Sequence, residues 1–139
     1  MKNVVVFTWA GRRRAIELRW VREIITLGPI AAAPGAPPCI AGATNYHGSV
    51  LPILVPETGT SRPRAGDPAI VVEVGDLTAA LATEGIGEVT TLRENSDAPE
   101  SDELIDASGS KVDAVQLAAL VDAAVTAIAA TRRLPEPAR

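Results

Sequence analysis

The chain opens with apolar positions that first alternate and then change period. Residues 4–9 are dense in β-branched and aromatic side chains, and after a short turn the alternation resumes over residues 15–18. This predicts a hairpin with Ile16 and Leu18 facing inward and the arginines Arg12–Arg14 at its tip. Apolar residues then recur at a spacing that predicts one or two helical turns ending before Gly28-Pro29: Trp20, Val21, Ile24 and Ile25.

Proline and glycine divide the middle of the chain. Residues 29–38 carry four prolines and one glycine, which predicts an extended, irregular surface segment. Residues 49–55 are predicted to form a strand, with Pro52 near a strand end, an edge or a bulge. Apolar residues vanish from residues 56–68, where proline, glycine and charge gather, so this segment is predicted to be a linker between two halves.

The second half shows the same alternation, with turn residues between short apolar runs. It is predicted to contain, in order, a hairpin over 69–74 and 77–83, a strand over 89–92, an acidic loop over 93–103, a hairpin over 104–107 and 111–115, a helix from Leu117 to about Arg133, and a flexible tail over 134–139.

These elements define the fold class. We expect a mainly β protein of about seven to ten short strands in two groups, with a short helix early and a longer helix last. Short antiparallel strands at this density favour small barrels or a sandwich, because closure removes exposed strand edges. At 139 residues the chain is expected to be a single domain spanning residues 1–139.

Composition narrows the functional classes. The formal net charge of −4 argues against nucleic acid, which is bound through a concentrated basic face. No stretch approaches the roughly 20 apolar residues of a membrane span, and the N-terminus lacks the pattern of a signal peptide. One cysteine rules out an internal disulfide. We therefore expect a soluble protein in a reducing, cytoplasmic setting.

Candidate catalytic chemistry is sparse. One histidine, His47, and one cysteine, Cys39, cannot supply the three or four ligands of a zinc or iron site, and no cofactor motif is present. Ser49 does not stand in a GxSxG turn, so a small hydrolase using His47 with Ser49 is a remote alternative. Arg12–Arg14 form either a solvated turn or a patch for an acidic partner. Binding is the better class of hypothesis than catalysis.

The order of three segments carries a more specific signal. "VVVFTWAGRRRAIELRWVREI" is followed by the proline-rich segment and then by "IAGATNYHGSVLPIL". These segments resemble the CheW-like domain family, which typically shows Val-x-Glu-Val/Ile, here Val21–Ile24, and later Gly-x-x-Asn-Leu-Arg-Gly, here Gly42–Gly48. His47 stands where the family has arginine. The residues "AIVVEVGDLTAALATEGIGEVTTL" resemble the next hairpin of the family, with Glu84 at its usual aspartate.

The resemblance implies two five-stranded barrels around a shared core and a non-catalytic adaptor. Such adaptors connect the cytoplasmic tip of a chemoreceptor to the regulatory domain of a CheA-type histidine kinase, in the cytoplasm at membrane-associated receptor arrays. An alternative is a divergent member that binds only one of these partners in an accessory or pilus-type pathway. Carried onto this chain, the partner-binding positions are Val21, Glu23, Ile24, Gly42, Asn45, His47 and Gly48.

Overall fold

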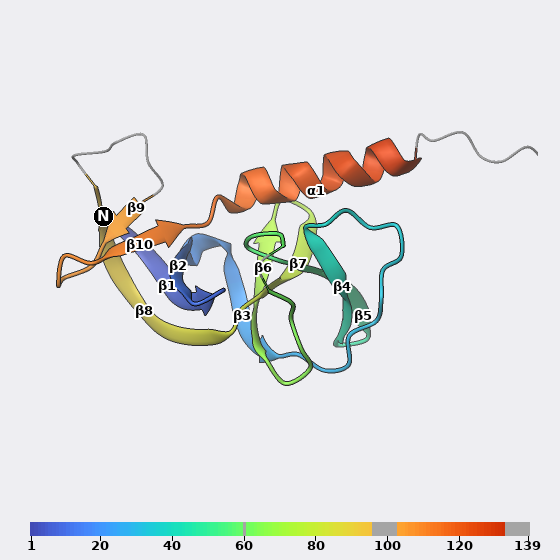
Figure 1. Ribbon diagram of the computed structural model, residues 1–139, viewed down its shortest axis with the longest axis horizontal. Helices are drawn as coiled ribbons and strands as arrows, with labels where there is room; N and C mark the ends of the chain where they lie inside the picture. Colours follow the sequence, from blue (N-terminus) through green and yellow to red (C-terminus); the bar gives the residue numbers. More distant parts are fainter. Residues whose placement is uncertain (60, 96–102, 133–139) are drawn as a thin grey trace, which may run out of the picture.

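Five strands from both ends of the chain form a closed barrel. The computed structural model describes residues 1–59, 61–95 and 103–132. The barrel strands follow the order β1-β2-β10-β9-β8, and β8 closes the barrel by pairing with β1 (Figure 1). Their bounds are β1 (Lys2–Trp9), β2 (Arg12–Glu17), β8 (Gly85–Glu94), β9 (Glu103–Ile105) and β10 (Lys111–Ala114).

The other five strands form a second sheet beside the barrel. Their order is β3-β6-β7-β5-β4, so β3 and β4 are its edge strands. Their bounds are β3 (Val21–Thr26), β4 (Ile40–Tyr46), β5 (Ser49–Leu54), β6 (Pro68–Val74) and β7 (Leu77–Ala82). One helix, α1 (Leu117–Arg132), follows the barrel and runs along the second sheet (Figure 1). The predicted mainly β architecture with two groups of five strands and a C-terminal helix is confirmed. The first group closes into one of the two predicted barrels, and the second is a sheet with two edge strands.

The path of the chain places the linker differently from the prediction. The predicted linker, residues 56–68, covers most of the connection from β5 to β6 and the first residue of β6, and both strands belong to the second sheet. The chain passes between the sheets at a 3-10 turn, η1 (Leu18–Trp20), and again at Thr83-Glu84. The polar composition of this segment marked a long loop within one sheet, whereas the chain can step from one sheet to the other without proline or glycine. The prediction that residues 56–68 separate two halves is therefore wrong.

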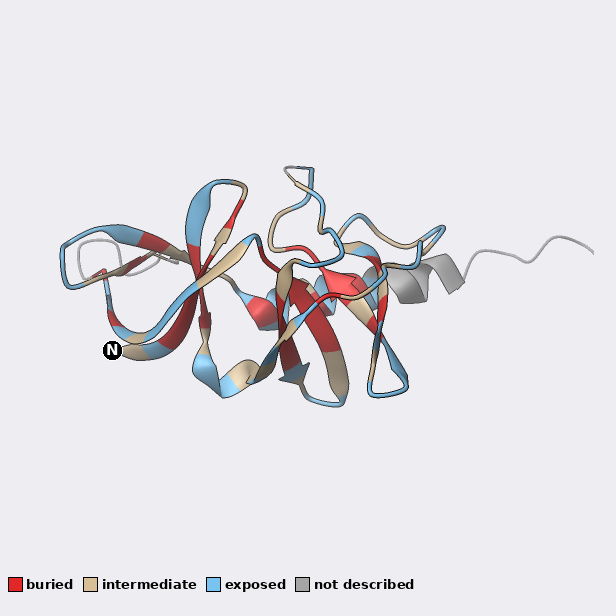
Figure 2. Cartoon of the chain, turned by 90° about the horizontal axis from the view of Figure 1, so that it is seen from below, coloured by how far each residue is buried: buried red, intermediate tan, exposed pale blue. Residues whose placement is uncertain are grey.

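Strand β1 supplies side chains to two cores at once. Val4 and Val6 point into the barrel, in a cluster with Ala15, Leu92, Leu104 and Val112. The alternate residues Val5, Phe7 and Trp9 belong to a larger cluster shared with the second sheet. Because successive side chains of a strand point to opposite faces, one apolar run serves both cores. Figure 2 shows the buried residues concentrated in the central strands, with exposed residues in the connecting loops.

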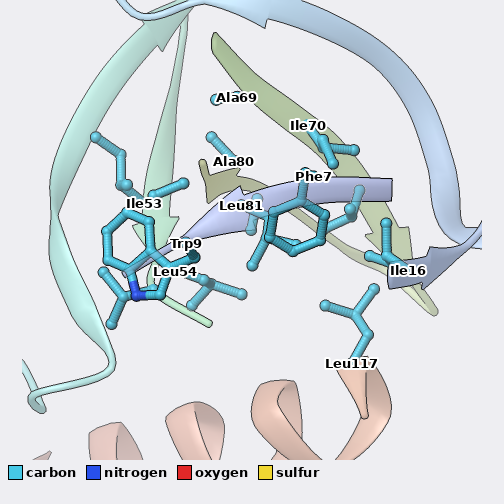
Figure 3. Packing of buried hydrophobic residues seen from close by; sticks show 14 of the residues in the cluster. Phe7, Trp9, Ile16, Ile53, Leu54, Ala69, Ile70, Ala80, Leu81 and Leu117 are labelled. Atoms are coloured by element: carbon cyan, nitrogen blue, oxygen red, sulfur yellow. The ribbon is translucent and has the colours of Figure 1, made fainter. Parts of the chain in front are cut away.

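The shared cluster holds the two sheets together. Phe7 and Trp9 lie against Ile53, Leu54 and Leu81 of the second sheet (Figure 3), and all five are at most 1% exposed. Much of the remaining volume is filled by fully buried alanines: Ala69, Ala79, Ala80 and Ala82. With aromatics at 3% of the chain, each large side chain in this cluster contributes a disproportionate share of the apolar contact.

Helix α1 covers the shared cluster with one stripe. Leu117, Val121 and Ala124 are buried, at a spacing that places them on one face of the helix. Asp122 and Val125 are exposed on the other side. The predicted helix is thus confirmed in position and in apolar face.

The helical turns predicted after Arg19 are wrong. Only η1 is helical there, and residues 21–26 form the strand β3, whose burial alternates residue by residue. Trp20, Val21, Ile24 and Ile25 fit a helical spacing, but β3 pairs with β6 from Val21↔Val72 to Thr26↔Pro68. Long-range pairing with β6 and the β-branched residues of this segment outweigh the local period. Leu18, predicted to face inward, lies in η1 and is 39% exposed.

The arginines lie in β2 rather than at the tip of the first hairpin. Trp9 pairs with Arg12, so Ala10-Gly11 form the turn, both at positive φ. Arg12 is paired with Asp113, and Arg13 with Asp106 at 2.8 Å. Arg14 is buried and paired with Glu57 of the β5–β6 loop. A solvated turn and a patch for an acidic partner were the two predicted alternatives for these arginines. The structure instead pairs them with acidic residues of the same chain, which attaches β2 to the β9–β10 hairpin and to the β5–β6 loop.

The remaining segments agree with the sequence in outline. Residues 27–39 are irregular, apart from a bridge between Ala31 and Ala43. Pro52 pairs with Ala43, whereas β5 pairs with β7 only at Ile53 and Leu54, so Pro52 has no β7 partner. The strand predicted over 89–92 extends over all of β8, which takes in Arg93 and Glu94 of the predicted acidic loop. Residues 96–102 of that loop and the predicted tail lie outside the described residues.

Asp106 is predicted to make the barrel sensitive to acid. Hydrogen bonds from Arg13 and from the Ser108 hydroxyl hold the pKa of this carboxyl well below its ordinary value of 3.8. A lowered folded-state pKa gives stability that is present above the ordinary value and is lost progressively as the pH falls below it. We expect Asp106→Asn to lower the melting temperature at pH 7, and we expect this difference to shrink progressively as the pH falls below about 4.

Thermal unfolding followed by circular dichroism between about pH 3 and 7 measures this effect. Asp76→Asn is the matched control, because Asp76 is an exposed aspartate in the β6–β7 turn. An equal destabilisation of Asp106→Asn at both ends of the pH range contradicts the electrostatic explanation.

Candidate docking site

The β4–β5 hairpin ends in a tight two-residue turn. Tyr46 pairs with Ser49, which leaves His47 and Gly48 in the turn at φ values of 50° and 84°. Positive φ at both central positions is the geometry of a type I′ turn, which suits the right-handed twist of the strands. The Asn45 side chain accepts a hydrogen bond from the Gly48 N–H at 3.1 Å. The turn therefore holds the His47 side chain at the end of the hairpin.

Glu23 meets this turn across the two edges of the second sheet. Glu23 lies on β3, and the Tyr46 hydroxyl at the end of β4 donates a hydrogen bond to its Oε1 atom. His47 Nε2 lies 3.6 Å from the same oxygen, and the rings of Tyr46 and His47 are 4.3 Å apart between centroids. The side chains of Glu23 and His47 are 41% and 78% exposed. The curvature of the sheet therefore brings its two edge strands together, so that the Glu23 carboxylate, the Tyr46 phenol and the His47 imidazole lie in contact at the surface.

Val21 and Ile24 lie apart from this group. Val21 is half-buried and packs against the shared cluster. Ile24 is 45% exposed and follows Glu23 directly along β3, so the two side chains project from opposite faces of the strand. Of the predicted docking residues, the structure brings together Glu23, Asn45, His47 and Gly48.

Gly42 is buried, and its surroundings indicate a structural role. It has φ 149°, and a Cβ at this position would lie 2.6 Å from the Ala31 carbonyl oxygen and 2.8 Å from Ile30 Cγ2. The register of β4 shifts between Ile40 and Gly42. Gly42 therefore allows the irregular segment before β4 to cross close over the strand. It was predicted as a docking residue, but in this structure it is buried beneath that segment.

Comparison with known proteins identifies the family of the chain. A model of the CheW-like domain matches residues 3–126. The chain belongs to the CheW-like domain family. The resemblance stated from the sequence is thereby confirmed. This is a family of non-catalytic scaffold proteins of chemotaxis signalling.

Solved structures give the same fold for this CheW-like domain. The crystal structure of the scaffolding protein TtCheW from Thermoanaerobacter tengcongensis is similar, with a TM-score of 0.65 and 19% sequence identity. The similarity covers 83% of this chain and 88% of that chain. Curated proteins yielded no match.

Tyr46 is the residue of this CheW-like site that sequence reasoning missed. The sequence showed it as the only tyrosine of the chain, beside the only histidine. Its contact with Glu23 joins residues 23 positions apart through two edge strands that do not pair with each other. Neither the composition nor the spacing of the residues predicts that Tyr46 and Glu23 come into contact.

The buried Arg14 of β2 lies where the barrel meets the β5–β6 loop of the second sheet. The Arg14 side chain is 8% exposed, and the hydrogen bond it donates lowers the pKa of the Glu57 carboxyl from its ordinary value. Trp9 Nε1 also donates to the backbone carbonyl of Glu57, at 3.4 Å. The loop after β5 is thus fixed to the barrel beside the shared cluster.

Other surface features lie away from the Glu23 group. A surface cavity of about 700 Å³ is lined by the proline-rich segment, Ile40, Val55, Gly59 and residues 61–63. Within the described ranges, histidine, cysteine and carboxylate side chains do not gather in groups of three or more that could hold a metal ion. No helix within the described residues is long and apolar enough to span a membrane.

Proposed function

We propose that this chain is a non-catalytic adaptor that couples the cytoplasmic tips of chemoreceptors to a CheA-type histidine kinase. It acts in the cytoplasm at membrane-associated receptor arrays. The observation that carries the proposal is the match to the CheW-like domain over residues 3–126. The exposed polar group of Glu23, Tyr46 and His47 supports it, since rigid edge strands display this group on the surface.

The adaptor function requires two partners at once. Purified protein is titrated in a calorimeter with a kinase regulatory domain and, separately, with a receptor signalling-tip fragment. Each titration is then repeated with the other partner at saturation. Binding of both partners, with retention of the second, is the expected result. Binding of neither fragment defeats the proposal.

A second candidate is a divergent member that binds only one partner, in an accessory or pilus-type pathway. The observation that favours it is His47, which replaces the permanent, five-donor guanidinium of the family pattern with an imidazole. Histidine cannot reproduce the forked hydrogen bonding of arginine. Binding of one fragment alone in the same titrations selects this candidate.

Glu23→Lys is predicted to weaken partner binding without unfolding the protein. The variant places a cation where the Tyr46 hydroxyl and His47 now meet a carboxylate, and it reverses the charge of an exposed side chain. We expect affinity for at least one partner to fall roughly tenfold. The free energy of unfolding is expected to change by less than about 1 kcal/mol.

Glu88→Lys is the matched control, because Glu88 is an exposed glutamate on β8 of the barrel. It makes the same change in net charge and is expected to leave the affinity close to wild type. Equal losses in the two variants indicate a general charge effect. A collapsed melting transition of Glu23→Lys shows that Glu23 is structural.

A further inference from the structure

The surface cavity between the proline-rich segment and the β5–β6 loop has the size of a binding site. Its volume is about 700 Å³, and sites that take ligands commonly measure roughly 300–1,000 Å³. The Ile40 N–H donates a hydrogen bond to the Pro37 carbonyl at 2.9 Å, which closes a turn in the proline-rich wall. The Val55 N–H donates to the Cys39 carbonyl at 3.0 Å. These bonds fix the proline-rich wall against the end of β5.

The opposite wall, formed by the β5–β6 loop, is attached to the barrel and to the crossing between the sheets. Glu57 of this loop is paired with the buried Arg14 of β2. Further along the loop, the Ser61 hydroxyl donates a hydrogen bond to Glu84 at 3.1 Å. Because hydrogen bonds hold both walls, the surface cavity is already formed before a ligand arrives. A ligand therefore does not have to order the two loops when it binds.

Arg62 makes the surface cavity locally positive. It alone carries a charge among the described lining residues. Neither Arg62 nor Arg64 forms an ion pair with the described residues, whereas the arginines of β2, η1 and β3 are each paired with a carboxylate. The carboxylates of the loop are engaged, Glu57 by Arg14 and Asp67 by the Arg64 backbone N–H. The charge of Arg62 is therefore available to an anionic group.

The rest of the lining is apolar and poor in hydrogen-bond donors. Three of the described lining residues are prolines, which have no N–H to donate: Pro37, Pro38 and Pro63. The N–H groups of Ile40 and Val55 are already donated to carbonyls. The guanidinium of Arg62, with five N–H donors, is therefore the principal group that can hold a carboxylate here.

We infer that the surface cavity binds an extended segment of a partner protein, with an acidic side chain on Arg62 and an aliphatic side chain against the proline wall. A guanidinium and a carboxylate form two parallel hydrogen bonds, which fix the orientation of the bound segment. The prolines and Ile40 offer apolar contact to the neighbouring side chain. The inference goes beyond the proposed adaptor function, because the surface cavity lies in loops apart from the Glu23 group.

The open form of the surface cavity favours a peptide segment over a small molecule. Pro38, Ala41 and Arg62 of its lining remain exposed to solvent. Sites for small molecules bury roughly 70–90% of the surface of their ligand. A cavity that leaves one side of its ligand uncovered suits a chain that continues in both directions across the surface.

The test follows the amide signals of the full chain by nuclear magnetic resonance at low salt, during titration with a capped peptide of sequence Ala-Leu-Glu-Ile-Ala. A second peptide carries Gln in place of Glu. Each peptide is titrated into wild type and into Arg62→Gln. Arg93→Gln is the matched control, because Arg93 is an exposed arginine on β8 of the barrel and makes the same change in net charge.

The expected result is movement of the Ile40, Ala41 and Arg62 amide signals of wild type. The Glu peptide should bind wild type about two- to fivefold more tightly than the Gln peptide, which is the effect of one exposed charge pair. Both peptides should bind Arg62→Gln equally, at the weaker affinity. Arg93→Gln should keep the preference of wild type.

Three results overturn the inference: no binding of the Glu peptide at these amides, equal affinity of the two peptides for wild type, or the same loss in Arg93→Gln as in Arg62→Gln. A third probe, isovalerate, tests for a small-molecule site. Binding of isovalerate at these amides as tightly as the Glu peptide assigns the surface cavity to a small carboxylate and also overturns the inference. The adaptor function is left in place by each of these results, because it is tested with the kinase and receptor fragments.

Discussion

Trp9→Ala should lower the free energy of unfolding by about 3–5 kcal/mol. Trp9 is fully buried at the junction of the barrel and the second sheet, in the same cluster as Ile53 and Leu54 (Figure 3). Removing the indole leaves a cavity that small and β-branched neighbours cannot fill without moving a strand. The loss is a large part of the 5–15 kcal/mol that stabilises a typical domain.

Urea unfolding followed by far-ultraviolet circular dichroism measures this change, because the method does not depend on the tryptophan that is removed. Trp9→Phe is the matched control, since it keeps an aromatic ring in the cluster and loses a smaller buried volume together with the long N–H contact with the Glu57 carbonyl. It should cost much less than Trp9→Ala. A loss below about 1 kcal/mol for Trp9→Ala contradicts the view that the shared cluster holds the two sheets together.

Gly42→Ala should destabilise the protein by about 1–3 kcal/mol and displace the segment that crosses over β4. The added methyl group collides with the backbone oxygen of Ala31, which is held by the hydrogen bond it accepts from the Ala43 N–H at 2.9 Å. Backbone cannot yield as the end of a flexible side chain can. The positive φ of Gly42 adds strain for any residue with a Cβ.

Chemical denaturation of Gly42→Ala gives the stability change, and hydrogen exchange at the Ala31 and Ala43 amides reports the bridge itself. Gly28→Ala is the matched control, because no atom lies within 4 Å of a Cβ at Gly28 and its φ is not in the left-handed region. Faster exchange at both amides in Gly42→Ala alone is expected. Unchanged exchange in that variant shows that the bridge does not depend on Gly42.

Local patterns predicted the elements whose determinants are close in sequence. Alternation flanking Gly75-Asp76 predicted the β6–β7 hairpin, and Ser108-Gly109 predicted the turn between β9 and β10. The apolar stripe that begins at Leu117 predicted α1. In each case the turn residues and the side-chain period are properties of a few consecutive residues, so tertiary structure had little to add.

The same local reasoning failed where a distant strand decides. Residues 21–26 have an apolar spacing compatible with a helix or a strand, and pairing with β6 selects the strand. Arg14 belongs to a run for which the sequence left open a solvated turn or a patch for an acidic partner, but its partner Glu57 lies 43 residues away in the same chain. No periodicity in the sequence records a contact at that separation.

By itself the sequence determined the family, most of the hairpins, the C-terminal helix and the presence of Glu23 and His47 as candidate docking residues. Tertiary structure alone decided the parallel pairing of β10 with β2, the burial of Gly42 and the meeting of Glu23 with Tyr46. The physical reason is range: turns and side-chain periods are set by neighbours along the chain, whereas these contacts exist only after two sheets have curved and packed around one shared core.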